Sequence, residues 1–533
     1  MQNRLLDYPY ASKRNVHVAK NGMIATSQPL AAQAGLDMLK NGGNAVDAAI
    51  ATAAALTVVE PTSNGLGGDA FAIIRFDNKM YGLNGSGKSP AALDVSALKR
   101  AGETSMPRFG VLPITTPGAV KAWIDMSERF GALDFETLIE PAIQYAKNGY
   151  AASPTLGESW QNAFKLYNHH LKDDVFTPLF DTFSPKGTPP NVGEVVKLQD
   201  HAKTLEAIQS TKGNAFYHGE IADKMVAYIQ KHGGLLSNDD LARHESEWVT
   251  PMKITYKGVN VYELPPNTQG MIALEALKIM EPEPFSLTVD YLHKQIEALK
   301  IAFSDGTKYI TDLNHMPIKP HQLLENDYIQ AKCEKISNHA QTFSFEDGQK
   351  GGTVYLATAD HAGNSVSFIQ SNYMGFGSGV VIPGTGIAMQ NRGHGFSNDQ
   401  AHPNKIAGNK RPYHTIIPGY IENPNVFEGP FGVMGGFMQP QGHMQVVSSL
   451  VDEGLNPQSA LDKPRWHWDK GRTIQVEQSM PNHIVNALRR KGHMVQVLPT
   501  ASLFGRGQII LRTPNQALLG GTEMRTDGHI ASY

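Results

Sequence analysis

The spacing of apolar residues changes once along this chain, and that change constrains the possible folds more than any other feature. Between about residues 118 and 340, apolar side chains recur every three to four positions, which predicts helices. After residue 353 they alternate with polar ones in short runs, which predicts strands. The predicted helices include 119–130, 135–148, 220–232, 271–280 and 291–303, and the predicted strands are 353–360, 365–370, 415–421, 474–477, 494–498 and 508–512. We therefore expect a helical layer that covers a strand-rich segment.

The first 80 residues contain both kinds of element. Ser27-Gln28-Pro29 predicts the N-cap and first turn of a helix over 30–40. The next predicted helix, 45–59, is almost wholly apolar but shorter than the ~20 residues that cross a bilayer, so it is predicted to be buried. An alternating strand follows at 70–76. Because strands are predicted in both halves, we expect both halves to form one folded body.

Composition argues against several classes of protein. The 533 residues include 47 Lys+Arg and 50 Asp+Glu, a formal charge of −3, which gives no basic stripe for nucleic acid. The single cysteine, Cys333, cannot form an intramolecular disulfide or a thiolate metal cluster. Residues 1–20 lack the apolar stretch of a secretory signal, so a cytoplasmic protein is expected, with no membrane partner. None of the 20 histidines lies in a His-Glu-x-x-His pattern, and no metal site is predicted.

The two regimes meet at a polar, glycine-rich stretch, 339–352, which ends abruptly at Thr353. Such a composition is typical of a mobile surface connection. On composition alone, Thr353 is a β-branched residue that begins a strand. Nothing in the local pattern by itself assigns it chemistry.

Several motifs along the chain occur in the order found in the γ-glutamyltransferase family. They include Gly42-Gly43-Asn44-Ala45-Val46-Asp47-Ala48-Ala49, Gly65-Leu66-Gly67-Gly68, Asp360-His361-Ala362-Gly363-Asn364, Gly375-Phe376-Gly377-Ser378-Gly379, Lys410-Arg411-Pro412, Gly435-Gly436 and the stretch from Gly520 to Gly528. The chain resembles this family over nearly its whole length. Thr353 stands at the position of the family's catalytic threonine.

This resemblance implies an α+β fold, the four-layer αββα sandwich of the N-terminal-nucleophile hydrolases. It also implies that the chain cuts itself between Gly352 and Thr353. A helix-rich large chain, 1–352, and a strand-rich small chain, 353–533, would then remain intertwined as one unit. Glycine before the nucleophile allows the peptide to distort as the threonine hydroxyl attacks the preceding carbonyl.

The resemblance further implies the catalytic roles. Cutting would free the α-amine of Thr353, which titrates near 7.7–8.0 and can serve as the base for its own hydroxyl, so no metal or organic cofactor is expected. Ser371 aligns with a second family threonine whose hydroxyl assists the nucleophile. Gly435 and Gly436 would supply the N–H groups that stabilise the oxyanion. Without the resemblance, this glycine pair would be read as a tight turn after a strand at 431–434.

The positions that hold the γ-glutamyl group in the family are changed here. The family arginine expected near residues 83–90 is absent, and Tyr373, Gly395 and the His414-Thr415 pair replace other family recognition residues. Arg392 is a new charge, and a guanidinium can bind a carboxylate through two parallel hydrogen bonds. We hypothesise that Arg392 and His414 bind a substrate carboxylate, with Asn372, Tyr373 and Thr415 also lining the site. A structural ion pair of Arg392 is the alternative.

The leading interpretation is a self-processing N-terminal-threonine amidohydrolase that acts on a small carboxylate-bearing amide such as oxamate. This departure from the family resembles its branch without secretory signals, which includes oxamate amidohydrolase and cephalosporin-acylase-like proteins. One alternative is a γ-glutamyltransferase or glutathione hydrolase with an altered grip on its donor. Another is a homologue that binds ligand without catalysis. A homodimer is possible, and the sequence does not decide between hydrolysis and transfer.

Overall fold

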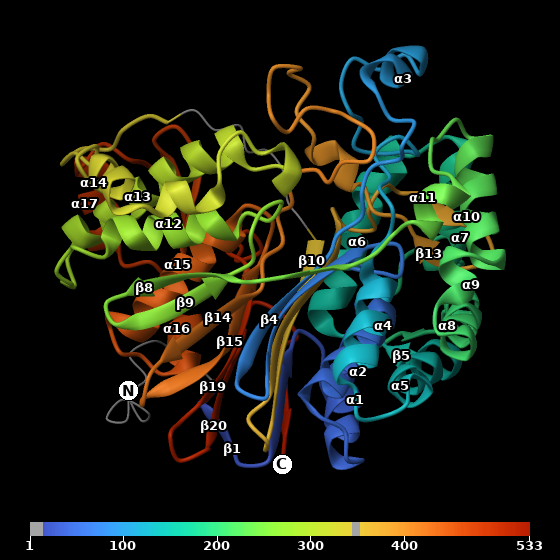
Figure 1. The fold of residues 1–533 in the computed structure, drawn as a ribbon, viewed down its shortest axis with the longest axis horizontal. Coiled ribbons are helices and arrows are strands. Elements are labelled where there is room, and N and C mark those ends of the chain that lie inside the picture. The colour runs from blue at the N-terminus through green and yellow to red at the C-terminus, as the bar shows by residue number, and fades with distance from the viewer. Residues whose placement is uncertain (1–13, 344–351) are drawn as a thin grey trace.

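The computed structural model describes residues 14–343 and 352–533, so most of the predicted connection at 339–352, including Gly351, lies outside the described residues. Two seven-stranded sheets lie face to face, and helices cover the outer face of each (Figure 1). The first sheet has the order β1 (His17–Ala19), β20 (Leu518–Thr522), β19 (Arg506–Arg512), β15 (Phe427–Met434), β14 (Gly419–Asn423), β9 (Val259–Glu263) and β8 (Met252–Tyr256). The second has the order β21 (His529–Ser532), β2 (Gly22–Thr26), β10 (Gly352–Asp360), β11 (Ser365–Tyr373), β3 (Asp69–Phe76), β4 (Lys79–Gly85) and β7 (Glu247–Val249).

The helices form two groups on opposite sides of the molecule (Figure 1). Those on the side of the second sheet are α1 (Pro29–Lys40), α2 (Ala45–Val59), α4 (Ala119–Phe130), α5 (Phe135–Asn148), α6 (Pro154–His170), α7 (Thr177–Phe183), α8 (Gln199–Thr211), α9 (Asn214–Tyr217), α10 (Glu220–Lys231) and α11 (Asn238–Ala242). Those on the side of the first sheet are α12 (Gly270–Met280), α13 (Val289–Tyr309), α14 (Asn326–Cys333), α15 (Met438–Val451), α16 (Pro457–Asp462) and α17 (Asn482–Arg490). The predicted four-layer αββα sandwich is confirmed.

Smaller elements complete the described part of the chain. A short helix, α3 (Val95–Arg100), projects above the two layers (Figure 1). The minor strands are β16 (Trp466–Lys470), β17 (Thr473–Glu477) and β18 (Met494–Leu498) in one small sheet, with β5 (Tyr150–Ala151) paired to β6 (Val195–Val196) and β12 (Val381–Ile382) paired to β13 (Ile387–Ala388). The short 3₁₀ turn η5 (Arg392–Gly395) carries the buried side chain of Arg392.

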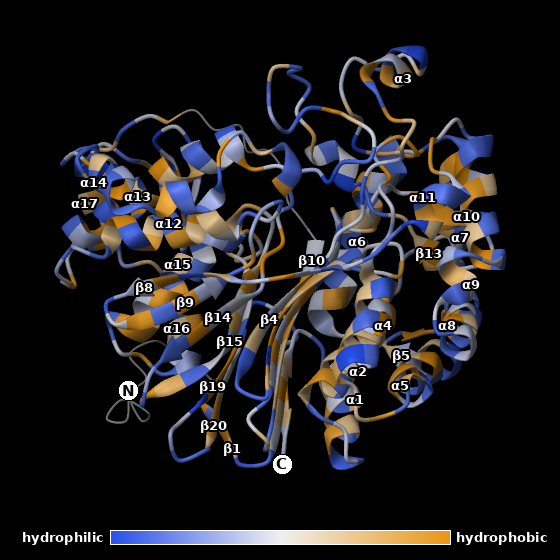
Figure 2. Cartoon of the chain, viewed as in Figure 1, coloured by the Kyte–Doolittle hydropathy of each residue, from blue (hydrophilic) through white to orange (hydrophobic). Residues whose placement is uncertain are grey.

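Apolar side chains from facing strands fill the space between the two sheets. Tyr355 of β10 lies so close to β15 that a Cβ on Gly432 would approach its ring to 2.4 Å. Alternate residues of a strand face opposite sides, so Thr353 lies on the same face of β10 as Tyr355. The hydropathy colouring shows the same concentration of apolar residues on the packed strands and helices (Figure 2). Thr353 therefore stands at the end of the layer between the sheets.

Helix α2 is buried at every residue, as its sequence predicts. Asn44 caps it, because its side chain accepts hydrogen bonds from the N–H groups of Val46 and Asp47, and the Asp47 carboxylate accepts one from the Asn44 N–H at 2.8 Å. Its neighbour α1 packs closely, because a Cβ on Gly35 would lie 2.3 Å from the Thr52 hydroxyl. Small side chains thus allow the close contact that places α2 against the strands of the site.

Several predicted elements agree with the structure, and three differ. The predicted bounds of α4 and α5 are confirmed. The region 118–340 is not one helical layer, because its helices divide between both outer layers, joined through the strand pair β8–β9 that the sequence analysis missed. Residues 415–418 are not a strand, and only the later part of that prediction lies in β14. Ser27 does not cap α1, because its hydroxyl donates to Glu60 instead.

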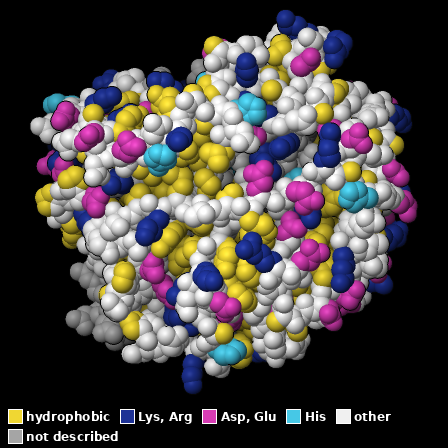
Figure 3. All heavy atoms as spheres, viewed as in Figure 1, with side chains coloured by type: hydrophobic (Ala, Val, Ile, Leu, Met, Phe, Trp, Pro, Cys, Tyr) yellow, Lys and Arg dark blue, Asp and Glu magenta, His cyan; other side chains and the backbone are white. Residues whose placement is uncertain are grey.

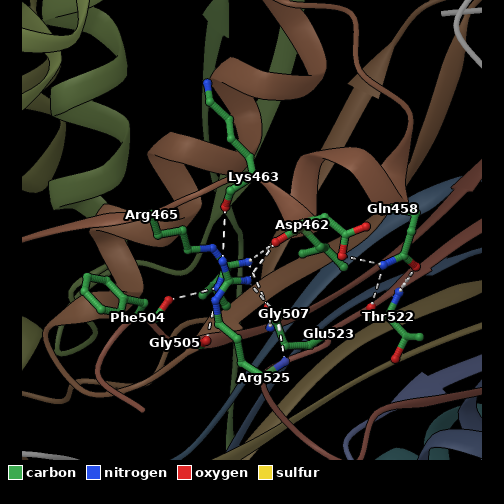
Figure 4. A network of polar contacts seen from close by, with 12 residues as sticks. Gln458, Asp462, Lys463, Arg465, Phe504, Gly505, Gly507, Thr522, Glu523 and Arg525 are labelled. Carbon is green, nitrogen blue, oxygen red and sulfur yellow. Dashed lines mark hydrogen bonds and ion pairs between the residues drawn. The ribbon is translucent and has the colours of Figure 1, made fainter. Parts of the chain in front are cut away.

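A buried ionic network fastens the end of the chain to the first sheet. Arg465 and Arg525 point toward one another with Glu523 beside them (Figure 4). Glu523 pairs with Arg465 at 2.9 Å and with Arg525 at 2.7 Å, and Arg525 also binds Glu477. Arg465 donates to the Gly505 carbonyl at 3.1 Å. Within the motif from Gly520 to Gly528, Glu523 and Arg525 therefore have a structural role, because both side chains form buried ion pairs.

The surface is mixed in charge. The face in Figure 3 shows basic and acidic side chains interspersed. No described helix combines the length and apolar character needed to cross a bilayer.

Candidate active site

Thr353 lies in β10 between β2 and β11, and its side chain is buried. Its hydroxyl donates a hydrogen bond to the Ser371 hydroxyl at 3.1 Å. Ser371 in turn donates to the carbonyl oxygen of Gly352 at 2.6 Å. The register shifts between Gly352 and Val354, so the ladder to β11 is irregular at the nucleophile. Gly352, Thr353 and Ser371, to which the family resemblance assigned roles, thus form one hydrogen-bonded chain.

Tyr373 ends β11 in a left-handed backbone conformation, with φ of +77°. Its N–H donates to the Ser371 hydroxyl at 2.8 Å. A tyrosine in this region is uncommon and is kept only where its surroundings fix it. Here the guanidinium of Arg392 lies over the ring, 4.1 Å from its centre. Tyr373 therefore links Arg392 to the hydroxyls of Ser371 and Thr353.

Arg392 begins the turn η5 and is fully buried. Its Nη1 donates to the Thr415 hydroxyl at 2.9 Å. Its Nε and Nη2 atoms are buried and have no hydrogen-bond partner among the residues that the structure describes. These two atoms form one edge of the planar guanidinium, the edge that matches the two oxygens of a carboxylate. Burial lowers the pKa of Arg392 to about 10, opposed by the nearby carboxylate of Asp69, so the group stays charged at neutral pH.

Asp69 is the buried carboxylate beside Arg392, and the sequence analysis did not select it. It begins β3 and pairs with Ser371 in the ladder. Its Oδ1 accepts hydrogen bonds from Gln390 at 2.9 Å and from the N–H of Gly87 at 3.0 Å. Burial raises the pKa of Asp69 to about 7, although Arg392 favours its charged form. Gly87 belongs to the loop where the family arginine was expected, so this loop supplies a backbone donor instead.

His414 is a buried side chain whose ring contacts other groups of the protein. Its Nε2 donates to Asp69 Oδ2 at 3.0 Å, and its Nδ1 accepts from the N–H of Ile416 at 3.4 Å. Burial, reinforced by Arg392, holds the pKa of His414 well below its usual value, so the ring is neutral. Both ring nitrogens are occupied. Direct binding of a substrate carboxylate by His414 stays a prediction, and it would require one of these two contacts to be exchanged.

Gly435 and Gly436 form the turn between β15 and α15. Their φ angles are +136° and +60°, conformations that favour glycine. The Gly435 carbonyl accepts from the N–H of Met438 at 3.1 Å, and the Gly436 carbonyl accepts from Gln269 at 2.9 Å. Gly505 backs the turn, since a Cβ on Gly435 would lie 3.2 Å from the Gly505 Cα atom. The turn is thus fixed from two sides.

Asn372 lies apart from the other predicted site residues. Strand alternation places it on the face of β11 opposite Ser371, the face from which Gln370 bonds the α2 carbonyl of Ala53. Its amide lies against the glycine loop, where a Cβ on Gly68 would come within 2.6 Å of its Oδ1. Within the described residues this amide has no hydrogen-bond partner.

One group of described side chains has metal-ligating atoms close together, namely His293, Glu297 and His493, within 4.8 Å of one another. His293 Nδ1 and His493 Nε2 already share a hydrogen bond of 2.8 Å, and Lys300 neutralises Glu297 at 2.7 Å. Because the charge is balanced, the cluster does not require a cation. Glu297 also accepts from the Gln341 N–H at 3.1 Å, which anchors the segment that precedes the junction.

Comparison with known proteins agrees with this geometry. The gamma-glutamyltranspeptidase family model matches residues 31–533. The chain belongs to this family. A glutathione hydrolase-like proenzyme of Bacillus subtilis is 34% identical, over 95% of this chain and 97% of the relative. An oxamate amidohydrolase proenzyme of Klebsiella pneumoniae is 31% identical, over 97% of this chain and 99% of the relative.

Among solved structures of the family, a cephalosporin acylase from Bacillus halodurans is similar with a TM-score of 0.95 and 54% identity, over 99% of this chain and 98% of that one. As a gamma-glutamyltranspeptidase family member with the αββα fold, the protein is an enzyme of the amide-hydrolysing N-terminal-nucleophile type. The family resemblance and the fold class expected from the sequence are confirmed.

Sequence reasoning missed Asp69, the buried carboxylate near Arg392, together with Gln390, which donates to Asp69, and Gln269, which donates to the glycine turn. One signal could have pointed to Asp69, because it is the lone charge between the Gly67-Gly68 pair and an apolar strand. Such a charge must be paired once the strand is buried. Gln390 and Gln269 carried no comparable signal.

Proposed function

We propose that this protein is a self-processing amidohydrolase whose nucleophile is Thr353 and whose substrates are small amides that carry a carboxylate. The observation that supports this substrate class is the Nε and Nη2 edge of buried Arg392, which no described residue hydrogen-bonds. The same guanidinium lies over the ring of Tyr373, whose N–H donates to Ser371, the hydrogen-bond partner of the Thr353 hydroxyl. A buried charge with open donors is costly unless a ligand completes it.

Self-processing would begin with attack of the Thr353 Oγ1 atom on the Gly352 carbonyl carbon. The hydrogen-bond chain offers a route for the proton, from Thr353 to Ser371 and from Ser371 to the carbonyl oxygen. The carbon–nitrogen bond then breaks, the nitrogen takes up the proton, and an ester joins Gly352 to the Thr353 oxygen. Water hydrolyses this ester, which frees the Gly352 carboxylate and the Thr353 amine. The products are chains 1–352 and 353–533.

In turnover, the freed amine of Thr353 would accept its hydroxyl proton while the oxygen attacks the substrate amide. The Gly435 and Gly436 N–H groups would stabilise the oxyanion, each worth roughly 3 kcal/mol of barrier. The substrate nitrogen leaves with the proton, and water then releases the acyl group. Arg392 and Thr415 would hold the carboxylate throughout, with the Tyr373 ring beneath the guanidinium.

The named relatives suggest two classes of substrate for this protein. The oxamate amidohydrolase relative supports a donor whose carboxylate adjoins the amide, which suits a single arginine. The glutathione hydrolase-like relative supports a γ-glutamyl donor held by a different residue set. The absence of an arginine in residues 83–90 favours the first, because the only cation of that loop is the exposed Lys88.

A matched pair of amides tests the proposal. Oxamide has the shape of oxamate with the carboxylate replaced by a neutral amide. We expect the cut enzyme to release ammonia from oxamate or a close carboxylate analogue far faster than from oxamide, with glutathione hydrolysed poorly. Equal rates for oxamate and oxamide, or efficient glutathione hydrolysis, would contradict the proposed substrate class. A chain that remains uncut and inactive would support a binding homologue instead.

The variants Arg392→Lys and Arg392→Ala distinguish the contribution of the positive charge to substrate binding from that of the two parallel hydrogen-bond donors. Lysine keeps the charge but cannot present two parallel donors, so KM should rise roughly 10-fold for Lys and 100-fold for Ala. Self-cutting should continue in both variants, which mass spectrometry of the two chains checks. An unchanged KM in Arg392→Ala would show that Arg392 is a structural residue.

A further inference from the structure

Asp69 is a buried carboxylate near the Arg392 guanidinium, where the substrate carboxylate is proposed to bind. The site already contains one carboxylate before any substrate binds, because Asp69 accepts from Gln390, two residues before Arg392, and from His414, the neighbour of the Arg392 partner Thr415. The Asp69 and Arg392 side chains are both fully buried. A substrate carboxylate would place a second negative charge against the same cation, in a region where charges are poorly screened.

Two carboxylates that share one buried site do not both remain ionised without cost, and one of them takes up a proton. The substrate carboxylate would receive two direct hydrogen bonds from Arg392 and would stay charged. Asp69 is held less directly, because no ion pair within 4 Å joins it to Arg392 among the described residues. Asp69 is therefore the group that would be protonated.

We propose that Asp69 is a specificity-determining residue that couples binding of the substrate carboxylate at Arg392 to uptake of one proton from solvent. In the empty site the Asp69 carboxylate balances the guanidinium. When the substrate binds, its carboxylate takes over this role and Asp69 becomes neutral. The site then favours ligands with a single carboxylate over neutral ones and over those that bring further negative charge. This inference rests on the proposed function.

The surroundings of Asp69 permit this change. The proton would reside on Oδ2, which faces His414, because Oδ1 accepts from both Gln390 and Gly87. The neutral ring of His414 can accept this proton's hydrogen bond after shifting its own hydrogen to Nδ1, which replaces the long 3.4 Å hydrogen bond from Ile416 by a contact between two N–H groups. The titratable or charged side chains that act on Asp69 are Arg392, Arg411, His414 and Tyr217.

The pH dependence has a defined sign. Burial raises the pKa of Asp69 to about 7 in the empty site, and the substrate charge would raise it further. Below about pH 7 Asp69 is already protonated, so binding needs no proton and is tightest. As the pH rises above 7, Asp69 ionises in the free enzyme and opposes the ligand, so the dissociation constant increases. It levels off above the pKa of the complex.

The test uses calorimetry of the cut enzyme with pyruvate, which has the shape of oxamate but no amide to hydrolyse. Titrations at pH 7.5 in two buffers of different ionisation enthalpy give the number of protons taken up. We expect net uptake in the wild type, and no uptake with pH-independent affinity in Asp69→Asn, since asparagine mimics the neutral carboxyl. Circular dichroism and thermal unfolding verify that the variant is folded.

Glu60→Gln is the matched control. Burial also raises the pKa of Glu60 to about 7, but this carboxylate accepts from Ser27 and lies 3.7 Å from Arg506. We expect Glu60→Gln to retain proton uptake. Equal uptake in wild type and Asp69→Asn, or its loss in Glu60→Gln, overturns the role of Asp69 while the carboxylate grip stands. Failure of pyruvate to bind, or undiminished binding by Arg392→Ala, overturns the grip itself and the inference with it.

Discussion

At the scale of single residues, the proposed mechanism depends on hydroxyl groups that relay a proton rather than on an acid–base side chain. Ser371 both accepts from Thr353 and donates to the Gly352 carbonyl. A serine and a threonine are equivalent for this purpose, because each has one donor and accepting lone pairs. The substitution of the family threonine by Ser371 therefore leaves the proposed chemistry possible.

Removal of the Ser371 hydroxyl should slow self-cutting. We expect Ser371→Ala to cut about 100-fold more slowly, because the developing oxyanion on Gly352 loses its donor. Ser371→Thr should cut at nearly the wild-type rate. Ser367→Ala is the control, since Ser367 lies on the same face of β11 but bonds Tyr355 at 2.8 Å. The measure is the fraction of cut chain on a denaturing gel over time, and normal cutting by Ser371→Ala would refute the relay.

At the scale of elements, the site lies where regular structure stops. Thr353 follows an irregularity of the β10 ladder, Tyr373 ends β11 with a positive φ, and Gly435-Gly436 separates β15 from α15. Irregular strand ends of this kind leave backbone N–H groups unpaired and change the direction of side chains, whereas a regular ladder pairs its N–H groups. The elements behind them, notably α2, are rigid and buried, so they hold these irregular ends in place.

The glycine turn offers a test at this scale. Gly436→Ala should lower kcat about 100-fold with little change in KM, because a side chain at φ of +60° displaces the proposed oxyanion donors. Gly454→Ala is the control, as Gly454 has nearly the same φ of +63° beyond the other end of α15. Both variants should lose about 1 kcal/mol of stability. If Gly454→Ala lowers kcat equally, the effect is one of stability alone.

At the scale of the whole molecule, each sheet combines strands from before and after residue 353. In the second sheet β10 and β11 lie between β2 and β3, and in the first sheet the block β20, β19, β15 and β14 lies between β1 and β9. The Arg465, Glu523 and Arg525 network then ties the last strands to the body. A cut at Gly352 would leave these contacts intact.

We therefore expect the two cut chains to behave as one particle. They should co-elute on size exclusion and appear as one mass under native conditions. They should separate only in denaturant, with a single unfolding transition, because neither set of strands can complete a sheet alone. Release of chain 353–533 in native buffer would contradict this expectation.

The sequence by itself determined the elements with strong periodicity, such as α4 and α5, because an amphipathic pattern needs no partner to be read. The family resemblance predicted roles for Thr353, Ser371 and the glycine pair, and Arg392 was predicted from a departure from the family pattern. The sequence could not show that β8 and β9 divide the middle region between two layers, since pairing is decided by distant strands. Only the tertiary structure decided that His414 serves Asp69 and leaves one edge of Arg392 open, because the competition among buried charges for partners depends on which side chains the fold brings together.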